Sequence, residues 1–122
     1  MVRRYLAIAT IVAGLATVAY AQSRGPNGGM LAGSGGHQTE LVVSPTELVV
    51  YLLHDGKAHE SDGTTLRAVI QQSGKTTAIS LVDQDGKRLV GKLSAPLAKG
   101  AVVVVTGKDH HGDAVNARYV IP

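Results

Sequence analysis

The chain has 122 residues, with 12 Lys and Arg, 9 Asp and Glu, and a formal net charge of +3 at pH 7. Because it has no cysteine, neither a disulfide framework nor a lipid anchor on cysteine is available to an exported form. Its aromatic residues are four Tyr, and no Lys/Arg cluster or aromatic-basic platform is present, which argues against nucleic-acid binding.

The first 21 residues have the pattern of a secretory signal peptide. Arg3 and Arg4 form a basic start, residues 5–18 are apolar and uncharged, and Ala19-Tyr20-Ala21 is a small-x-small cleavage site. The apolar stretch is shorter than the roughly 20 residues that span a bilayer, so we expect cleavage after Ala21 and export to the periplasm without a membrane span. The 122 residues less 21 leave 101, enough for one small domain.

Residues 22–36 form a glycine-rich N-terminal arm ahead of the expected domain, residues 37–122. The arm has neither helical nor strand periodicity, and we expect an irregular or mobile lead-in. A phosphate-binding loop is the alternative. It is disfavoured because no strand precedes the glycines and no helix follows them.

Seven short runs with strand character follow the arm, separated by turn signals at a spacing of about 8–12 residues. The second run, Glu47–His54, is apolar on both faces, so we expect it in the middle of a sheet. The pattern predicts an all-β fold: a single seven-stranded, immunoglobulin-like antiparallel β-sandwich, with a small closed barrel as the alternative. The runs are residues 37–43, 47–54, 64–72, 76–82, 88–93, 101–106 and 113–121.

Short motifs along the mature chain resemble a known family. They are Gly25-Pro26-Asn27-Gly28-Gly29, His37-Gln38-Thr39-Glu40-Leu41-Val42, residues 51–57, 89–93 and 95–97, Gly100-Ala101, and Asn116-Ala117-Arg118-Tyr119. In this order they resemble small exported bacterial β-sandwich proteins that are similar to the N-terminal β-domain of periplasmic adaptor subunits of heavy-metal efflux (RND-type) pumps. The resemblance implies a periplasmic β-sandwich associated with metal handling, as an accessory component of an efflux complex. Asn27 stands where that pattern often has a histidine, so no metal role is expected of the arm.

All five histidines are expected at one end of the predicted sandwich. Alternate loops of such a fold lie at opposite poles, and one pole receives the start of the first strand and the loops after the second, fourth and sixth strands. Imidazoles gathered with carboxylates are ligands for zinc or oxidised copper. The alternative is that loops simply tolerate histidine. The candidate metal ligands are His37, His54, His59, His110 and His111, and the neighbouring carboxylates are Asp55, Glu60, Asp62, Asp83, Asp85, Asp109 and Asp113.

Two other motifs give weaker indications of a chemical function. Asp83-x-Asp85-Gly86 resembles part of a calcium loop but lacks the closing glutamate, and a hairpin turn is the better interpretation. Ser34 lies between glycines without the Gly-x-Ser-x-Gly pattern of a nucleophile elbow. We therefore expect no enzyme and no catalytic residue.

Two functions are compatible with these patterns. The first is a periplasmic accessory protein that binds a divalent transition metal, zinc or copper, for buffering or transfer. The second is a structural or interaction module of an envelope complex with no metal role, motivated by the all-valine run Val102–Val105 and by strand edges that accept another strand. A carbohydrate-binding sandwich is disfavoured by the low aromatic content.

Overall fold

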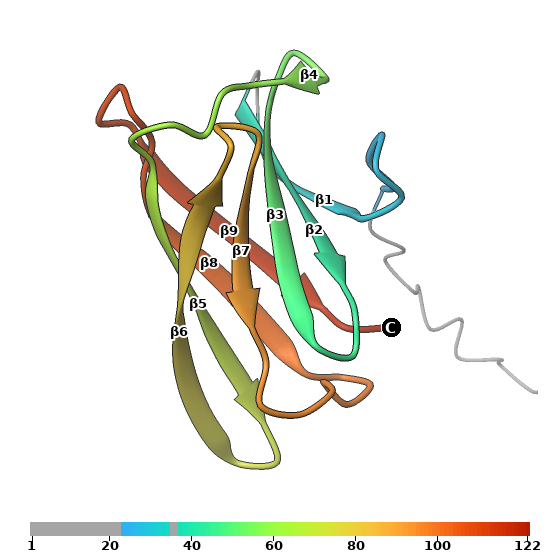
Figure 1. Ribbon diagram of the computed structural model, residues 1–122. Coiled ribbons are helices and arrows are strands. Elements are labelled where there is room, and N and C mark those ends of the chain that lie inside the picture. The colour runs from blue at the N-terminus through green and yellow to red at the C-terminus, as the bar shows by residue number, and fades with distance from the viewer. Residues whose placement is uncertain (1–22, 35–36) are drawn as a thin grey trace, which may run out of the picture.

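The computed structural model describes residues 23–34 and 37–122, and every regular element in these ranges is a strand (Figure 1). The expected signal peptide, residues 1–21, lies outside the described residues. Over those same ranges, no helix has the length and hydropathy needed to cross a membrane. The strands are β1 (Met30–Ser34), β2 (His37–Val43), β3 (Glu47–His54), β4 (Lys57–Ala58), β5 (Thr65–Gln72), β6 (Lys75–Gln84), β7 (Arg88–Lys92), β8 (Val102–Lys108) and β9 (Ala114–Val120).

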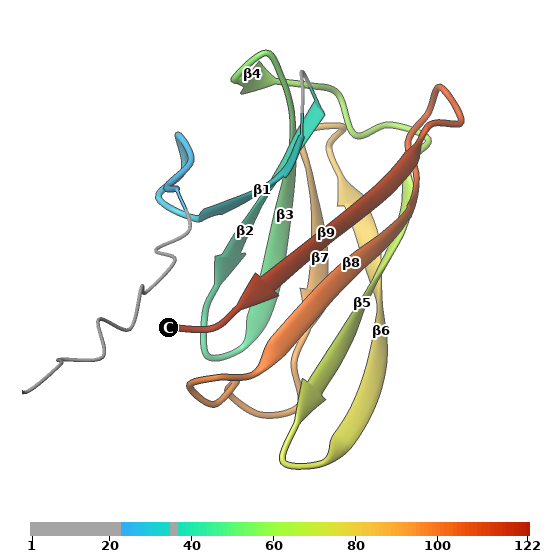
Figure 2. The same ribbon diagram turned by 180° about the vertical axis from the view of Figure 1, so that it is seen from behind.

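All strand pairs are antiparallel and follow one path, β1-β2-β3-β7-β6-β5-β8-β9, with β4 attached to β3. β6 belongs to both halves of this sheet, because Lys75–Leu81 pairs with β5 and Val82–Gln84 pairs with β7. The end strands β1 and β9 approach each other, so the sheet curves almost into a barrel (Figures 1 and 2).

The predicted all-β, antiparallel class is confirmed, but the strand count differs from the seven expected. β4 is a two-residue strand after the Asp55-Gly56 turn. β1 lies within the glycine-rich arm, so the expectation of an irregular lead-in is wrong for Met30–Ser34. β1 pairs with β2 from Met30 opposite Leu41 to Ser34 opposite His37. Main-chain pairing of this kind needs no alternating side chains, and the sequence therefore carries no periodic signal for it.

The core lies between the two halves of the curved sheet. β3 contributes Leu48 and Val50, and β8 contributes Val103 and Val105, all fully buried. β3 pairs with β2 and β7, which confirms its predicted central position. β8 also lies between two strands, β5 and β9, so the valine run 102–105 is a central strand and offers no edge.

Tyr119 of β9 links the two halves across the core. Its hydroxyl donates a hydrogen bond of 2.5 Å to the carbonyl oxygen of Thr39 in β2. Burial raises the pKa of Tyr119 above its ordinary value, and the negative charge of Glu40 adds to the rise. Tyr119 therefore stays protonated inside the fold at any ordinary pH.

Tight turns connect β3 to β4, β5 to β6 and β6 to β7. The first two have two residues, and the third belongs to a three-residue loop because Gln84 pairs with Arg88. Asp55-Gly56, Ser73-Gly74 and Asp85-Gly86 have φ angles of +49° and +78°, +51° and +72°, and +57° and +65°. Positive φ at both positions is the feature of a type I′ turn, whose twist matches that of the flanking strands. Because the backbone of Gly86 donates to the carboxylate of Asp83, the Asp83-x-Asp85-Gly86 motif is a hairpin turn.

Candidate metal centre

The fold brings all five histidines to one end of the molecule, as the loop topology predicts. The ring centroids of His37 and His54 are 4.9 Å apart, and those of His54 and His59 are 6.1 Å apart. The ring of His59 stacks on that of His110 at 5.0 Å, and the His110 and His111 rings are 3.9 Å apart. The imidazoles thus form one continuous series from β2 to the β8–β9 loop.

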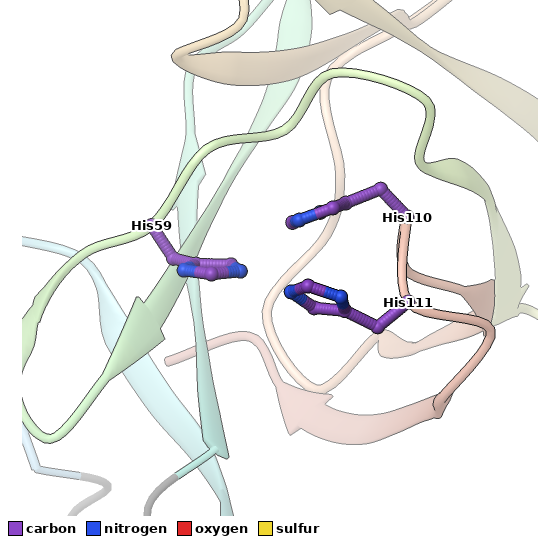
Figure 3. A group of neighbouring side chains, drawn as sticks. All are labelled: His59, His110 and His111. Carbon is purple, nitrogen blue, oxygen red and sulfur yellow. The ribbon is translucent and has the colours of Figure 1, made fainter.

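Three of them, His59, His110 and His111, are close enough to share an ion. One nitrogen from each ring lies within 4.8 Å of the others. Figure 3 shows the His59 ring extending from one loop toward the rings of His110 and His111, which come from the loop opposite. We call these residues the three-histidine cluster.

The His59 side of the cluster is anchored to the sheet. The backbone N–H of His59 donates to the carbonyl oxygen of Leu52 in β3 (2.8 Å), and its side chain is half-buried. Further along this loop, Ser61 donates its backbone N–H to Gly86 (2.9 Å) and its hydroxyl to Asp83. These bonds fix residues 59–64 against the β6–β7 turn, so His59 has a defined backbone position.

The His110 and His111 side of the cluster is the β8–β9 loop, organised by Asp109. One carboxylate oxygen of Asp109 accepts the backbone N–H groups of His111 and Asp113, each at 2.9 Å. The backbone N–H of Gly112 donates to the Asp109 carbonyl at 3.0 Å, and Gly112 has a φ of +80°. Asp109 therefore shapes the loop, and the two exposed histidine side chains project from it.

His37 and His54 lie on the strands beside this cluster. They are directly opposite each other in the β2–β3 ladder. The Nε2 atom of His54 is 3.5 Å from a carboxylate oxygen of Asp55, and the His54 side chain is 51% exposed. This pair is held by two strands, whereas the three-histidine cluster is held by loops.

A cavity of about 240 Å³ opens between these two groups of imidazoles. Its wall includes His37 from β2 and His59, and its apolar lining includes Leu52 of β3. Asp109 and Asp113 line the same cavity. One histidine of each group, His37 or His59, therefore lines this cavity together with two aspartates.

The predicted carboxylates do not all join the histidines. Asp83 accepts from Ser61 and Gly86, so its oxygens serve the turn. Asp62 lies over the same turn, because a Cβ atom added to Gly86 would come within 2.7 Å of its carboxylate. In the described part of the chain, the set of potential ligands with close mutual spacing consists of imidazoles alone.

Sequence reasoning missed the role of Glu40, which faces away from the core yet has no exposed surface. Its carboxylate accepts the backbone N–H groups of Asn27 (2.9 Å) and Gly29 (2.8 Å) and the side-chain amide of Asn27 (3.0 Å). The 25–29 turn of the arm thus closes over a buried charge. A Gly-Pro-Asn-Gly-Gly turn upstream of a glutamate in a strand is the only signal for this contact that the sequence contains.

The comparisons with known proteins add no relative to this geometry. No protein-family model, no curated protein and no solved structure matches the chain. The resemblance to efflux adaptor domains therefore stays a prediction, and the function has to be inferred from the chemistry of the histidine end.

Proposed function

We propose that this chain is an exported, periplasmic accessory protein that binds a divalent transition metal, zinc or copper, for buffering or transfer. The observation that carries the proposal is the three-histidine cluster, with its ligand nitrogens within 4.8 Å of one another. Tetrahedral zinc with Zn–N bonds of about 2.0–2.1 Å holds its ligands roughly 3.3 Å apart. His110 and His111 are exposed and lie in a loop, so we expect their side chains to adjust to that spacing when an ion binds.

The exposure of the cluster favours exchange of the ion over permanent retention. Three protein ligands leave one tetrahedral position for water or for a donor or acceptor molecule. His110 and His111 are exposed, so an incoming ligand has direct access to the ion. Such a role needs no bond-making chemistry, and we propose no enzymatic activity.

The strand order supports the finer fold prediction. Without β1 and β4, the path is β2-β3-β7-β6-β5-β8-β9, and β6 pairs with both β7 and β5. If β6 is grouped with β7, the two sheets are β2-β3-β7-β6 and β5-β8-β9. Four strands and three strands in this order are the arrangement of an immunoglobulin-like sandwich. With the signal-peptide pattern, this supports the proposed kinship with β-domains of efflux adaptors and a place beside a periplasmic efflux complex.

Titration of the chain lacking residues 1–21 with zinc and with copper, followed calorimetrically, tests the proposal. The His110→Ala/His111→Ala variant should bind at least about 100-fold more weakly, because two ligands are lost and even one supporting contact at a metal site is worth about 10–100-fold. Lys75→Ala/Lys99→Ala, which changes two exposed residues away from the histidine end, should bind like the unmodified chain. Unchanged affinity in the histidine variant would remove the loop pair from the site.

A second function, docking on a larger envelope complex, is favoured by a separate observation. Val42, Val49, Val90 and Val82 are consecutive partners across β2, β3, β7 and β6, and they form an apolar row on the outer face. Val82 is 65% exposed. A pull-down from envelope extracts with and without chelator separates the two functions, since a partner that is retained in chelator and lost in Val82→Asp favours docking.

A further inference from the structure

His37 and His54 form an imidazole pair outside the three-histidine cluster. They are partners in the β2–β3 ladder, and their ring centroids are 4.9 Å apart. Directly opposite residues of an antiparallel pair have Cβ atoms about 4.5–5.5 Å apart, so the main-chain register holds the two rings together. Ligands on strands are placed more precisely than ligands on loops.

The surroundings of this pair suit a cation. The Asp55 carboxylate lies 3.5 Å from Nε2 of His54, where it can orient the ring. Lys57 is the partner of His54 in the short β3–β4 ladder and brings one exposed positive charge to the same end. Two imidazoles with an opposing lysine nearby make a weaker site than three imidazoles.

The two groups of imidazoles are connected. The ring centroids of His54 and His59 are 6.1 Å apart, and His37 and His59 line the same cavity. Asp109 and Asp113 lie on the wall of that cavity, and their negative charge favours a cation in the space between the two groups of imidazoles. An ion that leaves one group therefore meets the imidazoles of the other within a few ångströms.

We propose that His37 and His54 form a second, weaker site for the same divalent ion, from which the three-histidine cluster is loaded. This inference rests on the proposed function. It adds that the chain binds two ions per molecule, in a fixed order of affinity.

Native mass spectrometry and calorimetry with zinc alone test the number of sites on the purified chain. The unmodified chain should bind two zinc ions. His37→Ala/His54→Ala should bind one zinc ion, at the tighter site, because it leaves His59, His110 and His111 in place. The Lys75→Ala/Lys99→Ala control should keep both ions.

Imidazole ¹H–¹⁵N spectra of the unmodified chain give a readout that needs no variant. The first equivalent of zinc should shift the resonances of His59, His110 and His111, and the second those of His37 and His54. One ion per unmodified chain, or two ions retained by His37→Ala/His54→Ala, overturns the second site and leaves the three-histidine proposal standing. Absence of any zinc binding overturns both.

Discussion

At the scale of single residues, Glu40 shows how an ionisable side chain is accommodated in this fold. Alternation along β2 puts it on the opposite face from Leu41, and that face is the outer one. It is nevertheless fully buried, because the 25–29 turn covers it and supplies N–H donors to both carboxylate oxygens. Strand periodicity predicts the face a residue occupies but not what covers that face, so the burial of Glu40 was not predictable.

Replacement of Glu40 by Gln should lower the free energy of unfolding by about 2–4 kcal/mol. Hydrogen bonds to a charged acceptor contribute about 1.5–3 kcal/mol each, and the Gln side chain turns one acceptor into a donor that faces N–H groups. Urea unfolding measures the difference. Glu60→Gln, at an exposed loop position, should stay within about 0.5 kcal/mol of the unmodified chain.

Tyr119 makes stability depend on alkaline pH. A folded-state pKa above the unfolded value of about 10 means that the unfolded chain releases this proton first as the pH rises. The stabilisation is thus complete below about pH 10 and is lost above it. Tyr119→Phe should cost about 1 kcal/mol at pH 7, through loss of the bond to Thr39, and should flatten the fall in stability above pH 10.

Thermal unfolding at a series of pH values between about 7 and 12 checks this difference. Tyr51→Phe is the matched control, since it removes a half-buried phenol and leaves the β9–β2 hydrogen bond in place. If the unfolding temperature of Tyr119→Phe falls with pH as steeply as that of Tyr51→Phe, the loss of stability at alkaline pH comes from other groups.

At the scale of elements, the hairpins were predictable because their turn residues act locally. Asp55-Gly56 and Ser73-Gly74 accept positive φ at both positions, whatever the rest of the chain does. β1 was not predictable, since its pairing uses the backbone and its sequence contains glycine. The sequence of the arm therefore indicates an irregular segment, although Met30–Ser34 extends the sheet by one strand.

Gly107 shows how closely strands approach at the histidine end. It has a φ of +152°, and an added Cβ atom would lie 2.1 Å from the carbonyl oxygen of Thr65 in β5. Gly107→Ala should destabilise the fold by about 2–4 kcal/mol, because the neighbour is backbone that cannot rotate away. Gly74→Ala is the control: it has a φ of +72° in open space and should cost about 1 kcal/mol from strain alone. Equal losses in denaturant unfolding would refute the close approach.

At the scale of the whole molecule, the gathering of the histidines was predictable and its details were not. The loops after β3 and β8 share one end because strands alternate in direction, which sets His59 near His110. Which imidazoles face one another depends on side-chain directions within loops, and the sequence does not encode these in any periodic form. The sequence predicts the correct end for Asp83, but its carboxylate accepts the Gly86 backbone N–H within the turn and does not join the histidines.

Zinc should raise the unfolding temperature of the whole domain. A ligand that binds the native state alone stabilises it by about 2.7 kcal/mol when its concentration is 100 times the dissociation constant. A chelator should reverse the shift, and His110→Ala/His111→Ala should show less of it. A shift of equal size in that variant would place the stabilising ion elsewhere.

Strand β6 belongs to both halves of the sheet, so we expect it to act as the hinge between them. Main-chain bonds join both halves along β6, whereas in ranges 23–34 and 37–122 no ladder joins β1 to β9. We therefore expect local opening of the sheet to begin at the seam between β1 and β9 and not along β6. Gly33 of β1 and Val115 of β9, on that seam, also border the cavity with His37 and His59. Thermal opening would thus widen this cavity first, and amides on β1 should exchange with deuterium before those in the middle of β6.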